Sequence, residues 1–325
     1  MPEPLIRERT CRLAVKSCTA VAPSSTANLG PGYDVFGLAL DALYDKVTIT
    51  REKGSDGRIT IKMSDTSIPA APESNSAGLV IKKMVQEFGV TDKLEVRVKK
   101  GVPAGYGMGS SAASAAAAAV AFDGLYKLKI KMEKLVEYAA EGEVASAGAK
   151  HYDNVSASVL GGFVISSMKS GPVPRFVRLA PPRDLVLVVA VPSIPVPERK
   201  TEVARSVLPN EVPLRSAVRN VSGASTIVAG FALKDVELIA SGIDDAIVEQ
   251  ARKHLIPGFD SVKEDALAAG ALAVTISGAG PSVIAFLKTS RNSKKVAKAM
   301  AAGFGKVGVK CRTFPCRPST GAHVV

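Results

Sequence analysis

The sequence predicts an α+β protein with two domains. Its 325 residues are enough for about two domains of ordinary size. Apolar and polar residues alternate at 58–63 and 94–100, which is the period of a half-buried strand. Between these segments, residues 75–89 have apolar side chains every three or four positions and end at a glycine, as amphipathic helices do. Strands and helices thus occur together, which indicates the α+β class.

The first half is expected to contain strands and two or three helices. A turn-rich stretch, APSSTANLGPGYD at 22–34, separates the first strand from the second. The predicted strands are 11–20, 36–52, 58–63, 94–100 and 161–167, and the predicted helices are 75–89, the alanine-rich segment after 109, and 131–147.

The second half is expected to form a sheet with helices on one face. The predicted strands are 185–193, the two halves of a strand–turn–strand unit at 271–288, and 309–317, and the predicted helices are 202–209, 214–240, 244–255 and 294–305. We place the domain boundary in the sequence MKSGPVPR, which gives domains at 1–168 and 169–325.

The composition indicates a protein without a membrane segment. Hydrophobic residues make up 46% of the chain, and no run of 18 apolar residues occurs. Residues 1–17 are a poor signal peptide, because charges flank only short apolar pieces. Four cysteines without a C-x-x-C pair and only three histidines argue against a zinc site or a disulfide framework. We therefore expect a cytoplasmic protein with no membrane partner.

The net charge of +12 is compatible with either a nucleic acid or a small anionic substrate as partner. Lysine and arginine are spread along the chain, and the densest cluster, at 289–300, looks like the solvated face of a helix. Aromatic residues are only 5% of the chain and do not interleave with the basic cluster. We expect no nucleic-acid partner. The charge is compatible with a nucleotide and a carboxylate as ligands, and its reason stays open.

Residues 102–122, VPAGYGMGSSAASAAAAAVAF, place three glycines before an alanine-rich helix. A glycine loop exposes backbone N–H groups, and the first turn of a helix adds unpaired N–H groups and the positive end of its dipole. Ser110 or Ser111 can cap the helix and offer a hydroxyl to a metal ion. On spacing alone, a phosphate site and an ordinary loop–helix junction fit equally well, and the Walker and Rossmann patterns do not fit.

Two further stretches combine small or polar residues with tight turns. The stretch SSTANLGPGYD, at 24–34, could present Asn28 and Asp34 to a small polar molecule, or it could be an ordinary turn whose side chains bond their own backbone. The stretch ISGAGPSVIAF, at 276–286, is a glycine turn between two apolar strands, and a plain hairpin fits it at least as well.

A fourth stretch, EGEVASAGAKHYDN at 141–154, joins a carboxylate to a histidine and an amide. Glu143 lies near the end of a predicted helix, with His151 and Asn154 beyond it. Carboxylate and hydroxyl oxygens suit Mg²⁺, which keeps most of its waters and binds phosphate oxygens. The alternative is a solvated helix end capped by His151.

Together the four stretches resemble the GHMP small-molecule kinases. Their first motif, in the form seen in homoserine kinases, resembles SSTANLGPGYDVFGLALD, and their phosphate loop, P-x-x-x-G-L-G-S-S-A, is similar to PAGYGMGSSAAS. The homoserine kinase segment H-P-D-N-V resembles HYDNVSASVLGGF, with Tyr152 where proline is common, and the third superfamily motif matches ISGAGPSVIAF. Further homoserine kinase segments resemble KTEVARSVLP and VEQARKHLIPGF, so the similarity covers nearly the whole chain in order.

The resemblance implies a two-domain GHMP kinase fold, with a ribosomal protein S5 domain 2-like N-terminal domain that binds ATP and a ferredoxin-like C-terminal domain. The glycine loop would wrap the phosphates of ATP, and Asn75 would lie near the adenine. The ATP-binding residues would be Asn75, Pro103, Ala104, Gly105, Tyr106, Gly107, Met108, Gly109, Ser110, Ser111 and Ala112. Ser111 and Glu143 would hold Mg²⁺ between the β- and γ-phosphates and so act in catalysis.

The same resemblance implies a pocket for L-homoserine between the first motif and the HYDN segment. Its amine and hydroxyl end would be held by Asn28, Asp34, His151 and Asn154, with Asp34 as the partner of the ammonium. Arg205 and Arg252 would clamp the carboxylate, with help from Thr201. Either arginine could instead be an exposed charge on a helix. Family members are often dimers, which implies a homodimer.

Asn154 raises a question of mechanism. Several relatives place a catalytic aspartate near this position, but an amide cannot accept the proton of the attacking hydroxyl. Asp153 is expected to point away from the site. We therefore predict a transfer without a protein general base, in which positioning and electrostatic stabilisation do most of the catalysis.

Three alternatives remain open. The first is another GHMP kinase, of the shikimate or mevalonate type, which His151 together with Asn154 argues against. The second is a ligand-sensing homologue without catalytic activity, but such relatives usually have lost the phosphate loop or the metal carboxylate, and both are present here. The third is a nucleic-acid-binding protein, which only the net charge favours.

Overall fold

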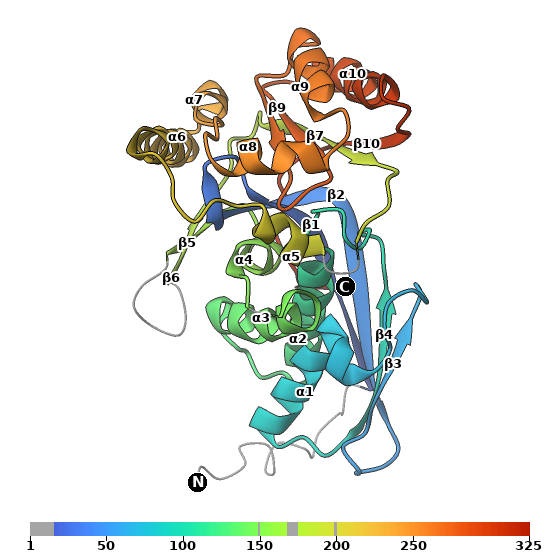
Figure 1. Cartoon of the computed structure of the whole chain (residues 1–325). Coiled ribbons are helices and arrows are strands. Elements are labelled where there is room, and N and C mark those ends of the chain that lie inside the picture. The colour runs from blue at the N-terminus through green and yellow to red at the C-terminus, as the bar shows by residue number, and fades with distance from the viewer. Residues whose placement is uncertain (1–15, 149, 168–174, 198–199) are drawn as a thin grey trace.

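The fold is known from a computed structural model that describes residues 16–148, 150–167, 175–197 and 200–325. Two sheets stand one above the other in Figure 1, and helices cover both. The helices of the lower sheet and five of its seven described strands come from the first half of the chain, and the upper sheet and its helices come from the second half. The expected α+β class is confirmed, because antiparallel sheets with one parallel strand pair occur together with ten α-helices within the described ranges.

The first sheet has seven strands in the described residues. They are β1 (Ser17–Asn28), β2 (Gly32–Glu52), β3 (Ile59–Met63), β4 (Lys93–Lys99), β5 (Phe163–Ser167), β6 (Arg175–Leu179) and β11 (His323–Val324). The order is β11-β1-β2-β4-β3, and the far end of the long β2 also pairs with β5, which pairs with β6. Only β3 and β4 run parallel. The long hairpin of β1 and β2 therefore forms the spine of this sheet.

Four helices pack on one face of the first sheet, as Figure 1 shows. They are α1 (Ser76–Phe88), α2 (Ser110–Tyr126), α3 (Met132–Ala147) and α4 (Tyr152–Leu160), and a 3₁₀ turn, η1 (Pro72–Ser74), precedes them. α2 lies at the centre, in contact with β1, β2 and the other three helices. Its alanines are buried on all sides, since small side chains allow so many neighbours to approach.

The second sheet has the order β10-β7-β9-β8 and is antiparallel throughout. Its strands are β7 (Val186–Pro192), β8 (Ala273–Ile276), β9 (Val283–Leu287) and β10 (Cys311–Cys316). The helices of this half are α5 (Lys200–Ser206), α6 (Leu214–Leu233), α7 (Val236–Ser241), α8 (Val248–Arg252), α9 (Phe259–Ala268) and α10 (Ser293–Gly305), with 3₁₀ turns η2 (Lys253–Leu255) and η3 (Ser290–Asn292). α9 and α10 close one face of the sheet.

A shared core joins the two halves. Leu38 and Leu40 of β2 pack in one buried cluster with Leu187 of β7 and Phe286 of β9. In the same cluster the rings of Phe163 and Phe231 stack with centroids 3.9 Å apart, although one residue lies on β5 and the other on α6. The expected boundary after residue 168 falls in 168–174, outside the described residues, and stays a prediction. Beyond it, β6 and β11 still pair with strands of the first sheet.

Several elements differ from the sequence-based expectation. β1 runs on to Asn28, through most of the stretch predicted as a turn, because the hydroxyl-bearing residues Ser24, Ser25 and Thr26 are fully buried and still pair with β2. The predicted helix 214–240 is broken at Lys234, whose φ of 60° ends α6. α4, α9, β6 and β11 were not predicted.

The expectations about cysteines and membrane segments can be compared with the described part of the chain. Cys18, Cys311 and Cys316 are free thiols there, and Cys11 lies outside it. No helix in the described ranges combines the length and the apolar character that crossing a bilayer requires.

Candidate active site

A cleft with a volume of about 770 Å³ lies where the two halves meet. Most of the residues predicted to bind ligand line it together, namely Asn28, Asp34, Asn75, Ala104, Gly105, Gly107, Gly109, Ser110, Ser111, Glu143, His151, Asn154, Thr201, Arg205 and Arg252. The fold thus gathers side chains from β1, α2, α3, α4, α5 and α8, which are up to 224 positions apart in the sequence, from Asn28 to Arg252. Four predicted members, Pro103, Tyr106, Met108 and Ala112, do not line the cleft.

The glycine loop approaches other backbone so closely that side chains are excluded. Gly107 has a φ of 76°, and a Cβ on it would lie 2.2 Å from the carbonyl oxygen of Ser277. Gly109 has a φ of 65°, and a Cβ there would lie 2.1 Å from Oγ of Ser25. Both positions therefore require glycine for their conformation and for space. Met108, between them, is buried in the shared core and anchors the loop through its side chain.

Capping of α2 differs from the expectation. Gly109 occupies the N-cap position without a side-chain cap, and Ser110 donates its hydroxyl to the carbonyl of Val102 at 2.8 Å. Neither serine caps the helix, so that prediction is wrong. The consequence is that the N–H groups of the first turn have no side chain of the cap residue in front of them. This is the arrangement that binds anions at helix N-termini.

A buried ion pair at the base of the glycine loop was missed by the sequence analysis. Asp45 of β2 accepts hydrogen bonds from the backbone N–H groups of Gly101 (2.9 Å) and Val102 (3.0 Å) and from the hydroxyl of Ser114 (2.6 Å). The ammonium of Lys100 pairs with the same carboxylate and donates to the carbonyl of Ser110 at 2.9 Å. Asp45 is 55 positions from Lys100, so no local motif could reveal this pair. The pair thus holds both ends of the glycine loop, at Gly101 and Val102 through Asp45 and at Ser110 through Lys100.

Ser111 and Glu143 meet at the wall of the cleft formed by α2 and α3. Burial raises the pKa of Glu143 to about 7, while a hydrogen bond from Ser111 lowers it, Asp153 raises it and Lys100 lowers it. No group of three or more His, Cys, Asp or Glu residues in the described ranges could hold a metal by itself. One carboxylate and one hydroxyl fit Mg²⁺, which takes few protein ligands and completes its shell with waters and phosphate oxygens.

One part of the cleft holds charges of both signs. The guanidinium of Arg205 contacts both carboxylate oxygens of Asp34, at 3.0 and 2.8 Å, and lies 3.2 Å from Nδ1 of His151. Asn28 accepts from the backbone N–H of Asp34 and donates to the carbonyl of Gly278 at 2.9 Å. The residue predicted for an ammonium and one predicted for a carboxylate are therefore paired with each other. Because the pair is about 40% exposed, separating it costs little.

Asn28 and Asp34 also share an uncommon backbone conformation. Their φ angles are 72° and 57°, in the left-handed region that side chains other than glycine rarely occupy. Such strain concentrates at ligand sites, where the surrounding structure holds it in place. This conformation is compatible with a ligand site, and the role predicted for the stretch 24–34 stays a prediction.

Arg252 is buried, with only 3% of its surface exposed, so it is not a surface charge. Its Nε donates to the carbonyl of Ala204 at 2.8 Å, and its guanidinium lies over the ring of Tyr33, 5.2 Å from the centroid. Burial lowers the pKa of Arg252, whereas Tyr33 and Asp34 raise it. Tyr33 was not singled out from the sequence, although it stands in the first motif.

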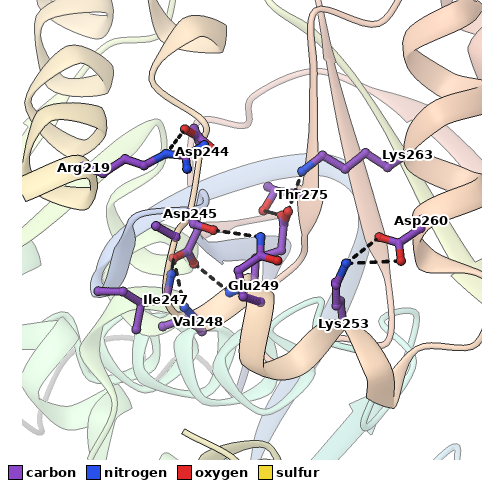
Figure 2. Close-up of polar contacts among 12 residues, drawn as sticks. Arg219, Asp244, Asp245, Ile247, Val248, Glu249, Lys253, Asp260, Lys263 and Thr275 are labelled. Carbon is purple, nitrogen blue, oxygen red and sulfur yellow. Dashed lines mark hydrogen bonds and ion pairs between the residues drawn. The ribbon is translucent and has the colours of Figure 1, made fainter. Parts of the chain in front are cut away.

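The short helix α8 that carries Arg252 is held by a polar network, shown in Figure 2. The carboxylate of Asp245 accepts from the backbone N–H groups of Ile247, Val248 and Glu249 at 2.8 to 3.0 Å. The buried Glu249 accepts from Thr275 of β8 at 2.8 Å and pairs with Lys263 of α9 at 2.5 Å. A helix of five residues has little stability of its own, so these contacts fix the direction of Arg252.

Asn154 stands near the start of α4 and lines the cleft beside Gly109, on which a Cβ would lie 3.1 Å from Oδ1 of Asn154. Its Oδ1 accepts from the hydroxyl of Ser25 at 3.0 Å, and its backbone N–H donates to Asp153 at 2.7 Å. Asp153 lines the same cleft, so the expectation that it points away is wrong. Burial raises its pKa to about 6 against the hydrogen bonds from Asn154. The hydroxyl of Ser25 and the carboxylate of Asp153 thus hold Asn154 from two sides.

Asn75 lines the cleft and also caps α1. Its side chain accepts from the backbone N–H of Gly78 at 3.2 Å and donates to the carbonyl of Pro69 at 2.7 Å. Its amide is therefore occupied by the local backbone, so at this position the structure shows a structural role as well as a place in the cleft.

Comparison with known protein families matches both halves of the chain. The model of the GHMP kinases N terminal domain matches residues 75–162, and that of the GHMP kinases C terminal domain matches residues 227–306. A homoserine kinase of Thermoplasma volcanium is 38% identical over 291 residues, which are 90% of this chain and 91% of the relative. A homoserine kinase of Saccharolobus solfataricus is 37% identical over 305 residues, which are 94% and 97% of the two chains.

Solved structures agree with these matches. The crystal structure of a homoserine kinase from Cytophaga hutchinsonii superposes with a TM-score of 0.90 at 34% identity and covers 97% of this chain and 99% of its own. A mevalonate kinase from L. major, solved with R-mevalonate, has a TM-score of 0.70 at 17% identity, over 95% of this chain and 99% of its own, and so shares the fold.

Proposed function

Because this chain belongs to the homoserine kinases of the GHMP kinase family, we propose that it transfers the γ-phosphoryl group of ATP to the side-chain hydroxyl of L-homoserine. The product is O-phospho-L-homoserine, an intermediate on the route to threonine. The observation that supports this most is the single cleft in which the glycine loop faces the residues suited to a zwitterion.

The glycine loop and the start of α2 bind the phosphates of ATP. Gly105, Gly107, Gly109 and the first residues of α2 line that part of the cleft, where their backbone N–H groups and the positive end of the helix dipole are available to an anion. Ser111 and Glu143 would hold Mg²⁺, which would supply positive charge beside the phosphoryl group that is transferred. Burial of Glu143 makes its carboxylate a strong partner for a cation, since the ionised form is poorly solvated at this position.

The acceptor end of the cleft binds homoserine by exchange of ion pairs. The ammonium of homoserine takes Asp34, and its carboxylate takes Arg205 and Arg252, with the hydroxyl of Thr201 nearby. The half-exposed pair of Asp34 with Arg205 opens in the process, so one weak internal pair is replaced by two pairs with the substrate. His151 and Asn28 keep these groups in position.

No protein general base takes part in the transfer. The amide of Asn154 cannot accept a proton, and the contacts of Asp153 are to Asn154 itself, whose backbone N–H and side-chain amide donate to its Oδ1 at 2.7 and 3.3 Å. Asp153 therefore orients Asn154 against the substrate hydroxyl. A loose transition state needs little activation of the nucleophile, and the proton can pass to a γ-phosphate oxygen.

The enzyme acts as a cytoplasmic homodimer without nucleic-acid or membrane partners. Exposed apolar residues on α6 support a partner copy, since Leu214, Val218 and Val221 lie one turn apart and are 80%, 59% and 66% exposed. Light scattering at several concentrations tests the dimer, and a monomer at all of them contradicts it.

A coupled assay of ADP release tests the reaction. Mg-ATP is offered with L-homoserine, mevalonate, shikimate and galactose in parallel. Turnover with homoserine alone is the expected result. Turnover with another acceptor keeps the kinase but overturns the substrate, and ATP binding with no turnover of any acceptor favours a ligand-sensing homologue.

A further inference from the structure

Lys200 is the cation of the cleft to which the proposed mechanism gives no role. It begins α5 and lines the cleft together with Ala104, Gly105 and Gly107 of the glycine loop. Its Nζ donates a hydrogen bond to the carbonyl of Gly280, in the turn between β8 and β9. The residue stands next to Thr201 in the segment KTEVAR, yet nothing in that segment marked it as a ligand.

The position of Gly280 places this ammonium at the phosphate end of the cleft. A Cβ built on Gly107 would lie only 2.7 Å from the same carbonyl oxygen of Gly280 that Lys200 contacts. The neighbouring Ser277 donates its hydroxyl to the carbonyl of Gly107 at 2.7 Å. The loop and the β8–β9 turn are thus in direct contact, and the ammonium of Lys200 lies where they meet, on the carbonyl of Gly280.

The two lysines of the cleft differ in their partners. Lys100 pairs with the buried carboxylate of Asp45. Among the described residues, Lys200 forms no ion pair, and its Nζ donates to a neutral carbonyl. A carbonyl is a weak partner for a full positive charge in a half-buried position. Lys200 is therefore a cation whose natural partner is an anion that enters from solution.

The charged groups around Lys200 agree with this. Arg252, from α8, opposes its positive charge, and together with burial it lowers the pKa of Lys200 to about 7, burial being the larger cause. The turn 277–282 contributes no ionisable side chain. The loop contributes Tyr106, whose hydroxyl donates to the carbonyl of Ile194, and α5 itself contributes Glu202 and Arg205.

We propose that Lys200 is a further phosphate-binding residue, which leaves the Gly280 carbonyl for an oxygen of the β- or γ-phosphate and takes up a proton as ATP binds. This rests on the proposed function, because it requires the triphosphate to lie in the glycine loop. A polyanion within about 4 Å favours the charged form of a lysine, so binding of the nucleotide and of the proton are coupled. Release of ADP then reverses the uptake, at least in part.

The test is calorimetric titration of the enzyme with Mg-ATP in buffers of different ionisation enthalpy, which counts protons taken up per ATP. With a pKa of about 7, about half of the Lys200 side chains are neutral at pH 7 and about nine tenths at pH 8. Because a cation bound at Glu143 would displace protons from that carboxyl, the contribution of Lys200 is the uptake of the wild type minus that of Lys200→Met. We expect this difference to rise from roughly half a proton towards one between these pH values. Lys200→Met should abolish this part of the uptake and weaken ATP binding about 10- to 100-fold, the effect of losing a charge-assisted hydrogen bond.

Lys200→Arg separates charge from titration. Arginine is always protonated, so this variant should bind ATP well while the proton uptake disappears. Lys288→Met, on an exposed lysine paired with Glu237, is the control and should change neither quantity. Wild-type proton uptake in either Lys200 variant, or unchanged ATP affinity in Lys200→Met with an unchanged melting temperature, would overturn the proposal. Failure of the wild type to bind Mg-ATP or to phosphorylate homoserine would instead overturn the proposed function.

Discussion

The two walls of the cleft hold their charges in different ways. On the wall formed by the first half of the chain, Lys100 and Asp45 are buried and satisfied by one another and by the backbone. On the wall formed by the second half, Lys200, Arg205 and Arg252 face the cleft with carbonyls or a half-exposed carboxylate as partners. We call the first the scaffold wall, because its charges are already paired with each other. We call the second the ligand wall, because its cations have weaker partners and are available to anions. We therefore expect stability to depend mainly on the buried pair of the first wall, and the cations of the second wall to contribute mainly to the binding of ligand anions.

The largest effect is expected at Glu143, the exception on the scaffold wall because we propose a catalytic role for it. Glu143→Gln removes the charge that would hold Mg²⁺, and we expect kcat to fall by about 10²- to 10³-fold. Steady-state kinetics at saturating substrates measure this loss. Glu133→Gln, on the exposed first turn of the same helix, should have no effect. A similar kcat in both variants would contradict the metal role.

The next effect tests the scaffold. Asp45→Asn leaves Lys100 buried without a counter-charge, which should lower the free energy of unfolding by about 3–5 kcal/mol. Denaturant titration measures it. The double variant Asp45→Asn with Lys100→Met removes both charges and should recover part of the loss. If the single variant were as stable as the wild type, the scaffold wall would not depend on this pair.

Arg252→Met tests the ligand wall in the opposite sense. It should raise the KM for homoserine about 10- to 100-fold and leave the KM for ATP within a few-fold, because a charge-assisted contact to the carboxylate is lost. Lys253→Met, one residue further and paired with Asp260, is the matched control. Equal changes in both KM values would show that Arg252 does not distinguish the two ligands.

Asp153 should reveal a pH-dependent cost of burial. Its pKa is about 6 when folded and near 3.8 otherwise, so the folded state binds more protons between these values. Stability due to this group is therefore highest below about pH 4 and falls as the pH rises through about 6. Asp153→Asn lacks this fall, and its stability relative to the wild type should improve by about 1–3 kcal/mol from pH 4 to pH 7. Parallel unfolding curves at the two pH values test it.

The smallest effect is expected on the activity of the same variant. If Asp153 only orients Asn154, Asp153→Asn should lower kcat by less than about tenfold and leave the shape of the pH profile unchanged. A general base would cost about 10²- to 10⁴-fold and would remove the acidic limb of the profile. That larger loss would contradict a transfer without a protein base.

The sequence predicted which residues line the cleft better than it predicted the contacts that hold those residues in place. Gly107, Ser111 and Arg252, which all line the cleft, could be predicted because each lies in a local pattern that the family resemblance identifies. The pair of Asp45 with Lys100 joins distant segments and has no local pattern. Asp153 was misplaced because its direction depends on how α4 starts, and α4 itself was missed since its nine residues are too few for a clear helical period.

The fold was predictable in the same uneven way. Strictly alternating strands such as β3 and β4 were found close to their true ends. β1 was cut short because Ser24, Ser25 and Thr26 look like a turn by composition, although neighbouring strands and α4 bury them. Tertiary contacts overrode local preference there.

The stacked rings of Phe163 and Phe231 have a consequence for how the protein melts. They belong to a core that takes residues from both sheets, so neither half could be separated without exposing large aromatic and aliphatic surfaces to water. The two halves should therefore lose their structure together, in a single calorimetric transition whose van't Hoff and measured enthalpies agree. Either half expressed by itself would expose its part of this apolar core to water and would aggregate, even if its own sheet were complete.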